Sequence, residues 1–184
     1  MQVIYLTGDL KFVFKGDLYN TATGKNVTVE TKQNLRALAF NSLDVSSMIS
    51  FLAKDSKIAK KNIYVFTDVD CGYCRKFHKE VALLNSKGIN VHYLAFPRAG
   101  QKGATYDKMV SVWCSNDRND VLSSAKQGRK IPAKKCNDPI SEHFRLGLEI
   151  ELKGTPAVFS EEGVELGGFI KAKDLERMLL KDKP

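Results

Sequence analysis

From residue 62 to the end of the chain, short apolar runs alternate with segments in which apolar residues recur every three or four positions. The continuous runs, which favour buried strands, occur at 62–66, 91–96, 157–159 and 164–166. Helical spacing predicts a helix after the first run (Phe77, Val81, Leu84), helices at 106–113, 120–126 and 140–148, and a last helix on Leu175, Met178 and Leu179. The last two runs flank a turn at 161–163, which predicts a hairpin.

This order of strand, helix, strand, helical insertion, hairpin and helix is that of a thioredoxin fold, an α/β architecture with a central sheet. We therefore expect residues 62–184 to form a thioredoxin-like catalytic domain.

The first 61 residues show a different pattern. Residues 3–6 and 12–15 alternate around a Thr-Gly-Asp turn and predict a hairpin, and 27–29 predict a third short strand. Asn34 is expected to cap a helix that continues through Leu52, and the charged segment 53–61 reads as a linker. The expected division is a partial, β-rich, dimerisation-like segment at 1–33 and a linker helix at 34–61, followed by the catalytic domain.

Composition and charge narrow the function classes. The chain has 184 residues, a formal net charge of +8 and 43% hydrophobic residues, which is ordinary for a globular protein. No stretch approaches the roughly 18 apolar residues of a membrane span, and residues 1–6 do not resemble a signal peptide, so we expect a mature or shortened chain without membrane insertion. The densest basic groups lack interleaved aromatic residues, which argues against nucleic-acid binding.

The motif Cys71-Gly72-Tyr73-Cys74 places two thiols where the strand at 62–66 gives way to a helix. The unpaired N–H groups and positive dipole end of a helix lower a cysteine pKa from about 8.5 to roughly 3.5–7.5. Cys71 is the predicted attacking sulfur, and Cys74, one turn later, the shielded resolving sulfur. The motif alone is only moderately specific, because half of a zinc site has the same spacing.

Cys114 and Cys136 lie in polar, turn-rich sequence and read as a disulfide across a loop. Closing a loop of this length would contribute about 3 kcal/mol in the chain-entropy model. An even cysteine count with one catalytic-looking pair and one structural-looking pair indicates an oxidising compartment. The alternative is that both are free thiols in the core.

Gly154-Thr155-Pro156 precedes the run at 157–159, where a cis X-Pro bond can form a tight turn. If this turn packs against Cys71, Thr155 offers backbone groups to an extended substrate, and Pro156, which has no N–H, disfavours metal binding. The alternative is a trans proline at the start of an edge strand.

Together with Phe66-Thr67-Asp68, the segment from Tyr93 to Arg98 and Trp113-Cys114, these motifs resemble those of the periplasmic thiol:disulfide isomerases of the DsbC/DsbG family. The resemblance runs from Tyr5 to the end of the chain. The Gly-Tyr pair between the cysteines is that of the DsbC branch.

The resemblance implies specific roles for these residues. It makes Cys71 the nucleophile and Cys74 the resolving cysteine, pairs Cys114 with Cys136 in a structural disulfide, and requires no cofactor and no metal. It also places four residues in support of the active site: Gly72, Tyr73, Thr155 and a cis Pro156.

The implied activity is isomerisation or reduction of incorrect disulfides in secreted proteins. The implied partners are misfolded disulfide-containing proteins, a membrane reductase of the DsbD type and a second copy of the chain. The implied location is the periplasm.

Two departures from the family pattern affect these expectations. Arg75 replaces a histidine, so that a permanent positive charge is expected to favour the Cys71 thiolate. Residues 1–33 resemble only the later strands of the family's dimerisation domain, whose opening helix is missing. We hypothesise that the chain keeps the thiol chemistry without the stable dimer, in which case a net dithiol oxidase or a DsbG-like reductase is the alternative activity.

A zinc-binding module that uses all four thiolates is the rival from another class, although Cys114 and Cys136 are too far apart to form a second short-spaced pair. Asp68 and Asp70 lie near Cys71 and read either as exposed loop acids or as aids to proton transfer, and neither is included in the site. His78 is expected to be an ordinary, partly exposed helix residue.

Overall fold

A five-stranded mixed sheet forms the centre of the computed structural model, which describes residues 1–53 and 61–180. The strand order is β3-β5-β4-β6-β7, in which β4 and β5 are parallel and the other neighbouring pairs are antiparallel. The strand bounds are β3 Ile49–Phe51, β4 Lys61–Thr67, β5 Ile89–Ala95, β6 Ala157–Ser160 and β7 Glu165–Gly167.

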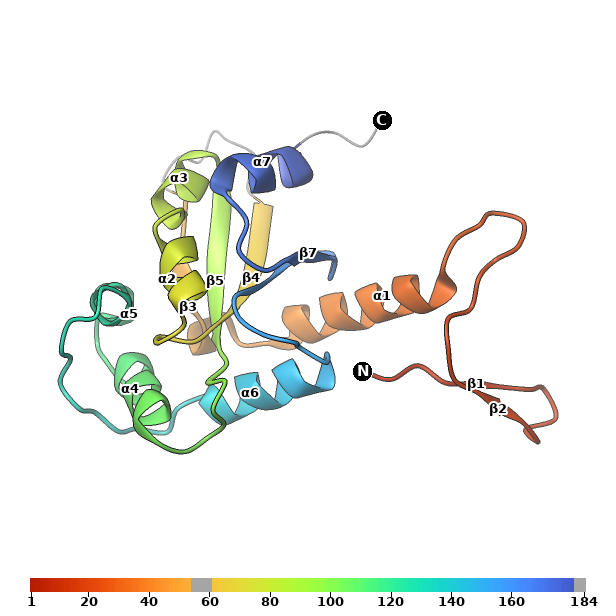
Figure 1. The fold of residues 1–184 in the computed structure, drawn as a ribbon, viewed down its shortest axis with the longest axis horizontal. Helices are drawn as coiled ribbons and strands as arrows, with labels where there is room; N and C mark the ends of the chain where they lie inside the picture. The colour runs from red at the N-terminus through yellow and green to blue at the C-terminus, as the bar shows by residue number, and fades with distance from the viewer. Residues whose placement is uncertain (54–60, 181–184) are drawn as a thin grey trace.

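Helices cover both faces of the sheet because β4 and β5 are apolar on both sides (Figure 1). Ile63 and Val65 face one hydrophobic cluster, whereas Tyr64 and Phe66 face the other. The first cluster receives side chains from α2 (Gly72–His78), α3 (Val81–Ser86), α4 (Ala104–Trp113), α5 (Arg118–Lys126) and α7 (Ala172–Leu180). The second receives them from α1 (Val27–Ser42) and α6 (Ile140–Glu149).

This architecture confirms the predicted α/β thioredoxin fold. Helices α4, α5 and α6 form the helical insertion between β5 and β6, and β6 and β7 pair as the predicted hairpin. The predicted strands and helices of this part lie within a few residues of the observed bounds.

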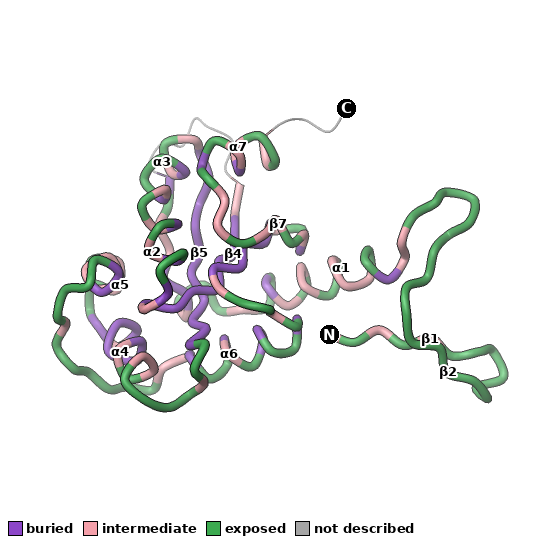
Figure 2. The backbone as a smooth tube through the Cα atoms, viewed as in Figure 1, coloured by how far each residue is buried: buried purple, intermediate pink, exposed green. Residues whose placement is uncertain are grey.

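The amino-terminal residues extend away from the sheet at the far end of α1 (Figure 1). They form a two-stranded hairpin of β1 (Tyr5–Leu6) and β2 (Val13–Phe14). Most of this segment is exposed, unlike the sheet (Figure 2). The predicted first hairpin is therefore present, with shorter strands than expected.

The predicted strand at 27–29 is wrong, because these residues form the first turn of α1. The side chain of Asn26 caps this helix by accepting a hydrogen bond from Val29 N at 3.0 Å. Thr28 is buried, and its Oγ1 accepts a hydrogen bond from Leu18 N at 2.8 Å. A cap and a tertiary contact thus outweigh the strand preference of a β-branched triplet.

The predicted helix from Asn34 to Leu52 is also wrong at both ends. The helix begins at Val27 and ends at Ser42, where Asp44 caps a short 3₁₀ turn, η1 (Val45–Ser47). The following residues form β3, because pairing with β5 supplies backbone hydrogen bonds that a continued helix could not make at the sheet edge. Of the expected linker, 54–60 lie outside the described residues, and Lys61 already belongs to β4.

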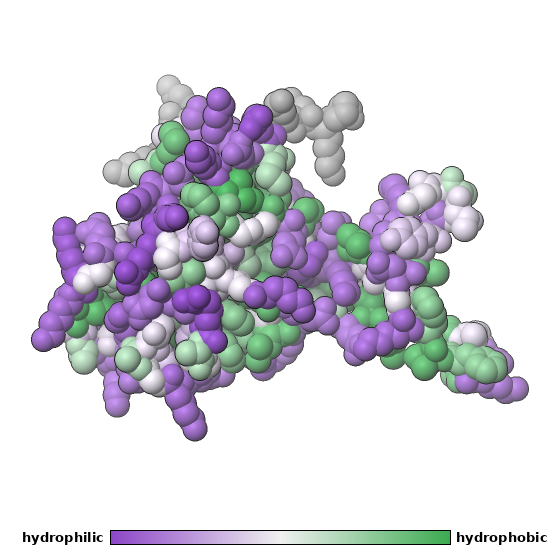
Figure 3. All heavy atoms as spheres, viewed as in Figure 1, coloured by the Kyte–Doolittle hydropathy of each residue, from purple (hydrophilic) through white to green (hydrophobic). Residues whose placement is uncertain are grey.

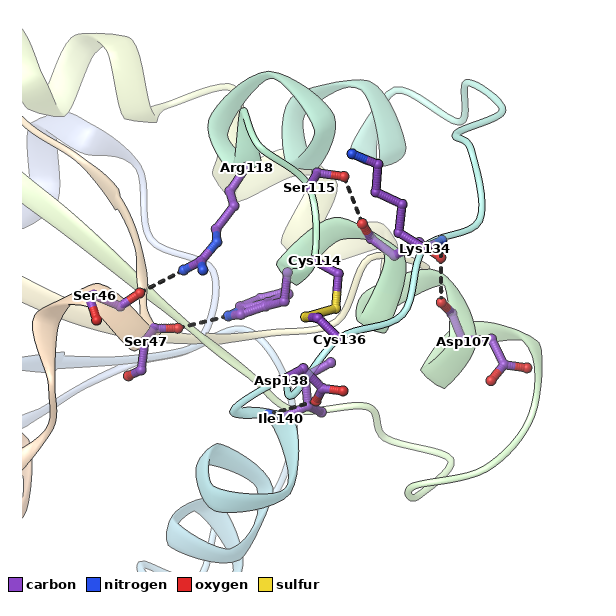
Figure 4. Close-up of a disulfide and its surroundings, with 12 residues drawn as sticks. Ser46, Ser47, Asp107, Cys114, Ser115, Arg118, Lys134, Cys136, Asp138 and Ile140 are labelled. Atoms are coloured by element: carbon purple, nitrogen blue, oxygen red, sulfur yellow. Dashed lines mark hydrogen bonds between the residues drawn. A yellow bond between two sulfur atoms is a disulfide. The ribbon is translucent and has the colours of Figure 1, made fainter.

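A disulfide joins Cys114, at the end of α4, to Cys136 in the loop before α6, with their Cα atoms 5.6 Å apart (Figure 4). The closed loop contains the whole of α5. Two further contacts hold this region to η1, since Trp113 donates from Nε1 to Ser47 O at 3.0 Å and Arg118 donates to Ser46 O at 2.6 Å. The disulfide therefore crosslinks the helical insertion internally, and the two polar contacts fix the insertion to η1.

Among residues 1–53 and 61–180, no helix is both long enough and apolar enough to span a bilayer.

Candidate active site

The two cysteines of the motif lie where β4 turns into α2. Cys71 is the N-cap of α2, and its carbonyl oxygen accepts a hydrogen bond from Arg75 N at 3.0 Å. Cys74 lies one turn later on the buried side of the helix. Both carry free thiols, with relative exposures of 3% for Cys71 and 1% for Cys74. The predicted strand-to-helix junction is observed, and both sulfurs are buried at the start of α2.

The loop before β6 packs against Cys71. Its Thr155–Pro156 peptide bond is cis. The Cys71 thiol donates to the carbonyl oxygen of Thr155, with Sγ 3.2 Å from that oxygen. The Thr155 hydroxyl is buried and has no hydrogen-bond partner in the described part of the chain. This hydroxyl is thus available to donate to a sulfur that becomes ionised.

The two thiols have pKa values shifted in opposite directions. Burial raises the pKa of Cys71, but the Thr155 hydroxyl, which can donate to the ionised sulfur, hydrogen bonds from Cys74 and the positive charge of Arg98 outweigh it, so the pKa lies below that of an ordinary thiol. Burial raises the pKa of Cys74 above the ordinary value, although the charge of Lys126 and the nearby Thr155 hydroxyl oppose this effect. Cys71 is consequently the more easily ionised of the two.

Asp68 is buried and holds Arg98 beside the cysteines. Its Oδ2 accepts hydrogen bonds from Arg98 N and Nε, both at 3.1 Å, while Oδ1 accepts from Asp70 N at 2.8 Å. Of the two interpretations left open for Asp68, that of an exposed loop acid is therefore wrong, because Asp68 is 2% exposed. Its carboxylate fixes an arginine whose charge acts on Cys71.

Asp70 has a different set of partners. Lys108 donates to both of its oxygens, at 2.6 and 2.9 Å, and Thr105 donates at 2.9 Å. Arg75, which was expected to favour the Cys71 thiolate, donates to Asp70 at 3.1 Å and to the carbonyl oxygen of Val69 at 3.1 Å. A carboxylate lies beside each of the two arginines, but the charge that lowers the pKa of Cys71 is that of Arg98 and not that of Arg75.

A groove of about 490 Å³ runs along the Thr155–Pro156 loop. It is lined by Tyr73, Lys153, Gly154, Thr155, Pro156, Ala157, Glu165, Gly167, Gly168 and Phe169. The Tyr73 side chain is 59% exposed, and its ring centroid lies 6.3 Å from that of Phe169. Three of the predicted support residues, Tyr73, Thr155 and Pro156, thus meet at one surface. Gly72 is exposed but does not line this groove.

Three residues of the site escaped prediction as site residues, namely Thr67, Arg98 and Lys126. Thr67 lies in the motif Phe66-Thr67-Asp68 and Arg98 ends the motif that begins at Tyr93, but nothing in their residue types indicated a role. Lys126 is in a predicted helix, on the same face as the buried residues Leu122 and Ala125. A lysine that shares the apolar face of a helix was the available signal.

His78 is half-buried and acts neither as a ligand nor as an exposed base. Its Nδ1 lies 3.0 Å from the hydroxyl oxygen of Tyr93 and its Nε2 lies 3.0 Å from Ser123 Oγ. Burial, with a smaller contribution from the Lys126 charge, lowers the pKa of His78 to about 4. The ring is therefore neutral near pH 7 and belongs to a polar network beneath the cysteines.

The disulfide also decides against the zinc alternative. Because Cys114 and Cys136 are bonded to each other, they cannot supply thiolates to a four-cysteine site. Within the described ranges, no group of three or more histidine, cysteine and acidic side chains is arranged to hold a metal ion.

Comparison with known proteins agrees with the thioredoxin fold and with the cysteine pair described above. A family model described as a thioredoxin-like domain matches residues 52–182. The chain is 35% identical over 177 residues to the thiol:disulfide interchange protein DsbC of Salmonella typhimurium and 34% identical to that of Escherichia coli strain K12. Each match covers 96% of this chain and 72% of the relative.

The fold is also similar to solved structures. A disulfide interchange protein from Neisseria gonorrhoeae superposes with a TM-score of 0.64 at 21% identity, over 76% of this chain and 100% of that chain. At this level of identity the match supports the fold, whereas the sequence relatives carry the family assignment.

Proposed function

Because the chain belongs to the family of DsbC thiol:disulfide interchange proteins, with a thioredoxin-like domain at 52–182, we propose that Cys71 and Cys74 carry its activity. The chain is a thiol:disulfide oxidoreductase, and its proposed task is to isomerise or reduce incorrect disulfides in secreted proteins.

In the proposed reaction the Cys71 thiolate attacks one sulfur of a substrate disulfide. A bond forms between Cys71 and that sulfur, the substrate disulfide breaks, and the second substrate sulfur leaves as a thiolate that takes a proton from water. The mixed disulfide is then resolved in one of two ways. Another substrate thiolate displaces Cys71, which completes an isomerisation, or Cys74 displaces the substrate, which completes a reduction.

The opposed pKa shifts of the two thiols carry this proposal. A lowered pKa at Cys71 supplies an attacking thiolate and makes the same sulfur a good leaving group in the mixed disulfide. A raised pKa at Cys74 keeps that thiol protonated, which gives a substrate thiolate time to react first. A low pKa at Cys71 combined with a high pKa at Cys74 therefore favours isomerisation over immediate release of a reduced substrate.

The test uses Cys71→Ser and Cys74→Ser variants in the refolding of scrambled ribonuclease without added oxidant. We expect Cys71→Ser to abolish the recovery of ribonuclease activity and to form no mixed disulfides. Cys74→Ser should accumulate mixed disulfides that non-reducing electrophoresis detects. Equal activity of Cys71→Ser and the unmodified protein would refute the proposal.

We propose that the groove along Thr155 and Pro156 binds an extended segment of the substrate. The rings of Tyr73 and Phe169 offer apolar contact, and the side chains of Lys153 and Glu165 give the groove one charge of each sign. A groove with this mixed lining suits unfolded chains of varied sequence, as expected for misfolded disulfide-containing proteins.

The proposed location is the periplasm, where an oxidising environment maintains the Cys114–Cys136 disulfide. An isomerase in this compartment needs its active pair kept reduced, and a membrane reductase of the DsbD type is the proposed electron donor. Trapping a mixed disulfide between Cys74→Ser and the reductase's periplasmic domain would test this partnership.

In contrast to the hypothesis of a chain without the stable dimer, we propose that the hairpin at the amino terminus contacts a second copy of the chain. Large apolar side chains on it are exposed, from 40% to 73%: Ile4, Leu6, Leu10, Phe12, Val13, Phe14, Leu18 and Tyr19. Figure 3 shows apolar side chains gathered over this segment. A two-stranded hairpin is marginal alone, and its open edges and apolar residues favour pairing with another copy.

Analytical ultracentrifugation at micromolar concentration tests this contact. A dimer that dissociates when Phe12 and Phe14 are replaced by serine would support it. A monomeric unmodified chain would refute it and would leave the active pair open to oxidants, in which case the net oxidase or the DsbG-like reductase becomes the expected activity.

A further inference from the structure

Lys126 is a buried cation beneath the cysteines. It is the last residue of α5, within the loop closed by the disulfide, and it is only 4% exposed. Lysine is almost never buried to this extent unless it is paired. Its Nζ donates to Thr67 Oγ1 at 2.7 Å and lies 5.4 Å from the centroid of the Tyr93 ring. No carboxylate in the described part of the chain lies within 4.0 Å of it, so the usual counter-ion is missing.

The groups that face Lys126 come from four elements. They are Thr67 at the end of β4, Asp68 and Cys71 in the following loop, Cys74, Arg75 and His78 on α2, and Tyr93 on β5. Asp68 is held by Arg98, and the neutral His78 is held by Tyr93 and Ser123. Cys71 carries no charge while it is bonded to substrate in the mixed disulfide, so the anion left for Lys126 at the resolving step is the Cys74 sulfur, toward which the Thr67 hydroxyl can also donate.

We propose that Lys126 is the buried base of Cys74, which removes the thiol proton through the Thr67 hydroxyl and then, as an ammonium ion, holds the resulting thiolate. This inference rests on the proposed function of the two cysteines.

In the proposed step the neutral Lys126 amine accepts a proton from Thr67, which at the same time accepts one from the Cys74 thiol. The Cys74 thiolate then attacks Cys71 Sγ in a mixed disulfide. The Cys71–Cys74 bond forms, the bond to the substrate sulfur breaks, and the substrate leaves as a thiolate. The ammonium group loses its excess proton to solvent when the pair is next opened.

The proton affinities of the two groups fit this exchange. Burial lowers the pKa of Lys126 to about 8, although the negative charges of Cys74 and Asp68 oppose the shift. Burial raises the pKa of the Cys74 thiol. A pKa of about 8 leaves part of the Lys126 amine unprotonated near neutral pH, which suits a general base, and the raised pKa of the thiol means that the Cys74 thiolate exists only briefly, as it attacks Cys71.

The test isolates the resolving step. The full chain is prepared with glutathione bound to Cys71, and the release of glutathione by Cys74 is followed from pH 6 to 10. Lys126→Met should slow this release at least tenfold at pH 7, since each unit by which the pKa of Cys74 rises lowers the thiolate fraction tenfold. Its rate should keep rising with pH where that of the unmodified protein levels off near pH 8.

Two further variants separate a base from a fixed charge. Lys126→Arg keeps the charge but cannot give up its proton in this range, so it should restore part of the rate without the levelling near pH 8. Thr67→Val, which is close in shape, should slow release in the same direction as Lys126→Met. Lys130→Met removes one exposed charge from the same loop and should leave the profile unchanged.

Release by Lys126→Met with the unmodified rate and pH profile would overturn the inference, as would full recovery in Lys126→Arg or an equal effect of Lys130→Met. Formation of the mixed disulfide at Cys71 is the independent readout of the proposed function. It should remain within about threefold of the unmodified protein in Lys126→Met, so the failure of one proposal can be told from that of the other.

Discussion

The disulfide between Cys114 and Cys136 should stabilise the fold chiefly by limiting the unfolded chain. Cys136 is exposed and Cys114 only half-buried, so replacing both with alanine removes little buried surface. The bond closes a loop between residues 22 positions apart. In the chain-entropy model this loop contributes about 3 kcal/mol, and for a chain of this size the double variant should unfold about 6 to 12 °C lower.

The measurement is made in a Cys71→Ser/Cys74→Ser background, which leaves the structural pair as the one remaining source of redox change among the four cysteines. Urea unfolding of this background and of the same chain with Cys114→Ala/Cys136→Ala gives the difference in the free energy of unfolding. Adding a reductant to the background should reproduce the loss, and adding it to the quadruple variant should change nothing.

Hydrogen exchange adds a local readout. Leu122 and Ala125 anchor α5 in the main core, so the helix should stay folded without the bond. In the variant without the disulfide, the amides of α5 should nevertheless exchange faster than those of β4, because the 114–136 segment opens more easily when it is not closed by the bond. A loss of stability below about 1 kcal/mol, or a reductant effect that persists in the quadruple variant, would refute the entropic account.

Three further outcomes are expected. His143 is fully buried, and burial lowers its pKa to about 4, whereas the pKa of this side chain in the unfolded chain is about 6.5. Its contribution to the free energy of unfolding is therefore complete above pH 6.5 and is lost as the pH falls toward 4. His78 has a similarly lowered pKa and contributes in both proteins, so urea unfolding should show a loss between pH 7 and pH 5 that is about 2 kcal/mol smaller in His143→Asn, and an equal loss in the variant would contradict this. Arg98→Met removes a half-exposed cation from beside Cys71, so alkylation of Cys71 by iodoacetamide at pH 7 should slow roughly threefold, and an unchanged rate would count against the assigned role. Gly147→Ala would place a methyl group 2.5 Å from the Phe96 ring, so thermal unfolding should reveal a loss of about 1–3 kcal/mol, and unchanged stability would contradict this close packing.

Much of the fold could be predicted from the sequence because its main signals are local. The runs that became β4 and β5 are apolar on both faces, so each indicated a buried strand without reference to the rest of the chain. The first turn of α1 shows where this fails. Val27-Thr28-Val29 has a strand-like composition, but the Asn26 cap and the Thr28–Leu18 contact make it helical.

The reactive pair could also be predicted from sequence, because two cysteines at this spacing before a helix carry their own chemistry. Their surroundings could not. Arg98 and Lys126 are ordinary residue types, separated from Cys71 by 27 and 55 positions in the chain. The sequence pattern around Arg98 and around Lys126 does not indicate that either residue lies near a cysteine.

The sequence by itself therefore determined the order of the main strands and helices of the thioredoxin domain and the identity of the sulfur atoms. Only the tertiary structure decided which charges and hydroxyl groups surround each sulfur. The physical reason is that periodicity and helix capping act between neighbours along the chain. The pKa of a buried thiol depends instead on burial and on charges that packing brings from β4, α5 and the loops after β5 and before β6.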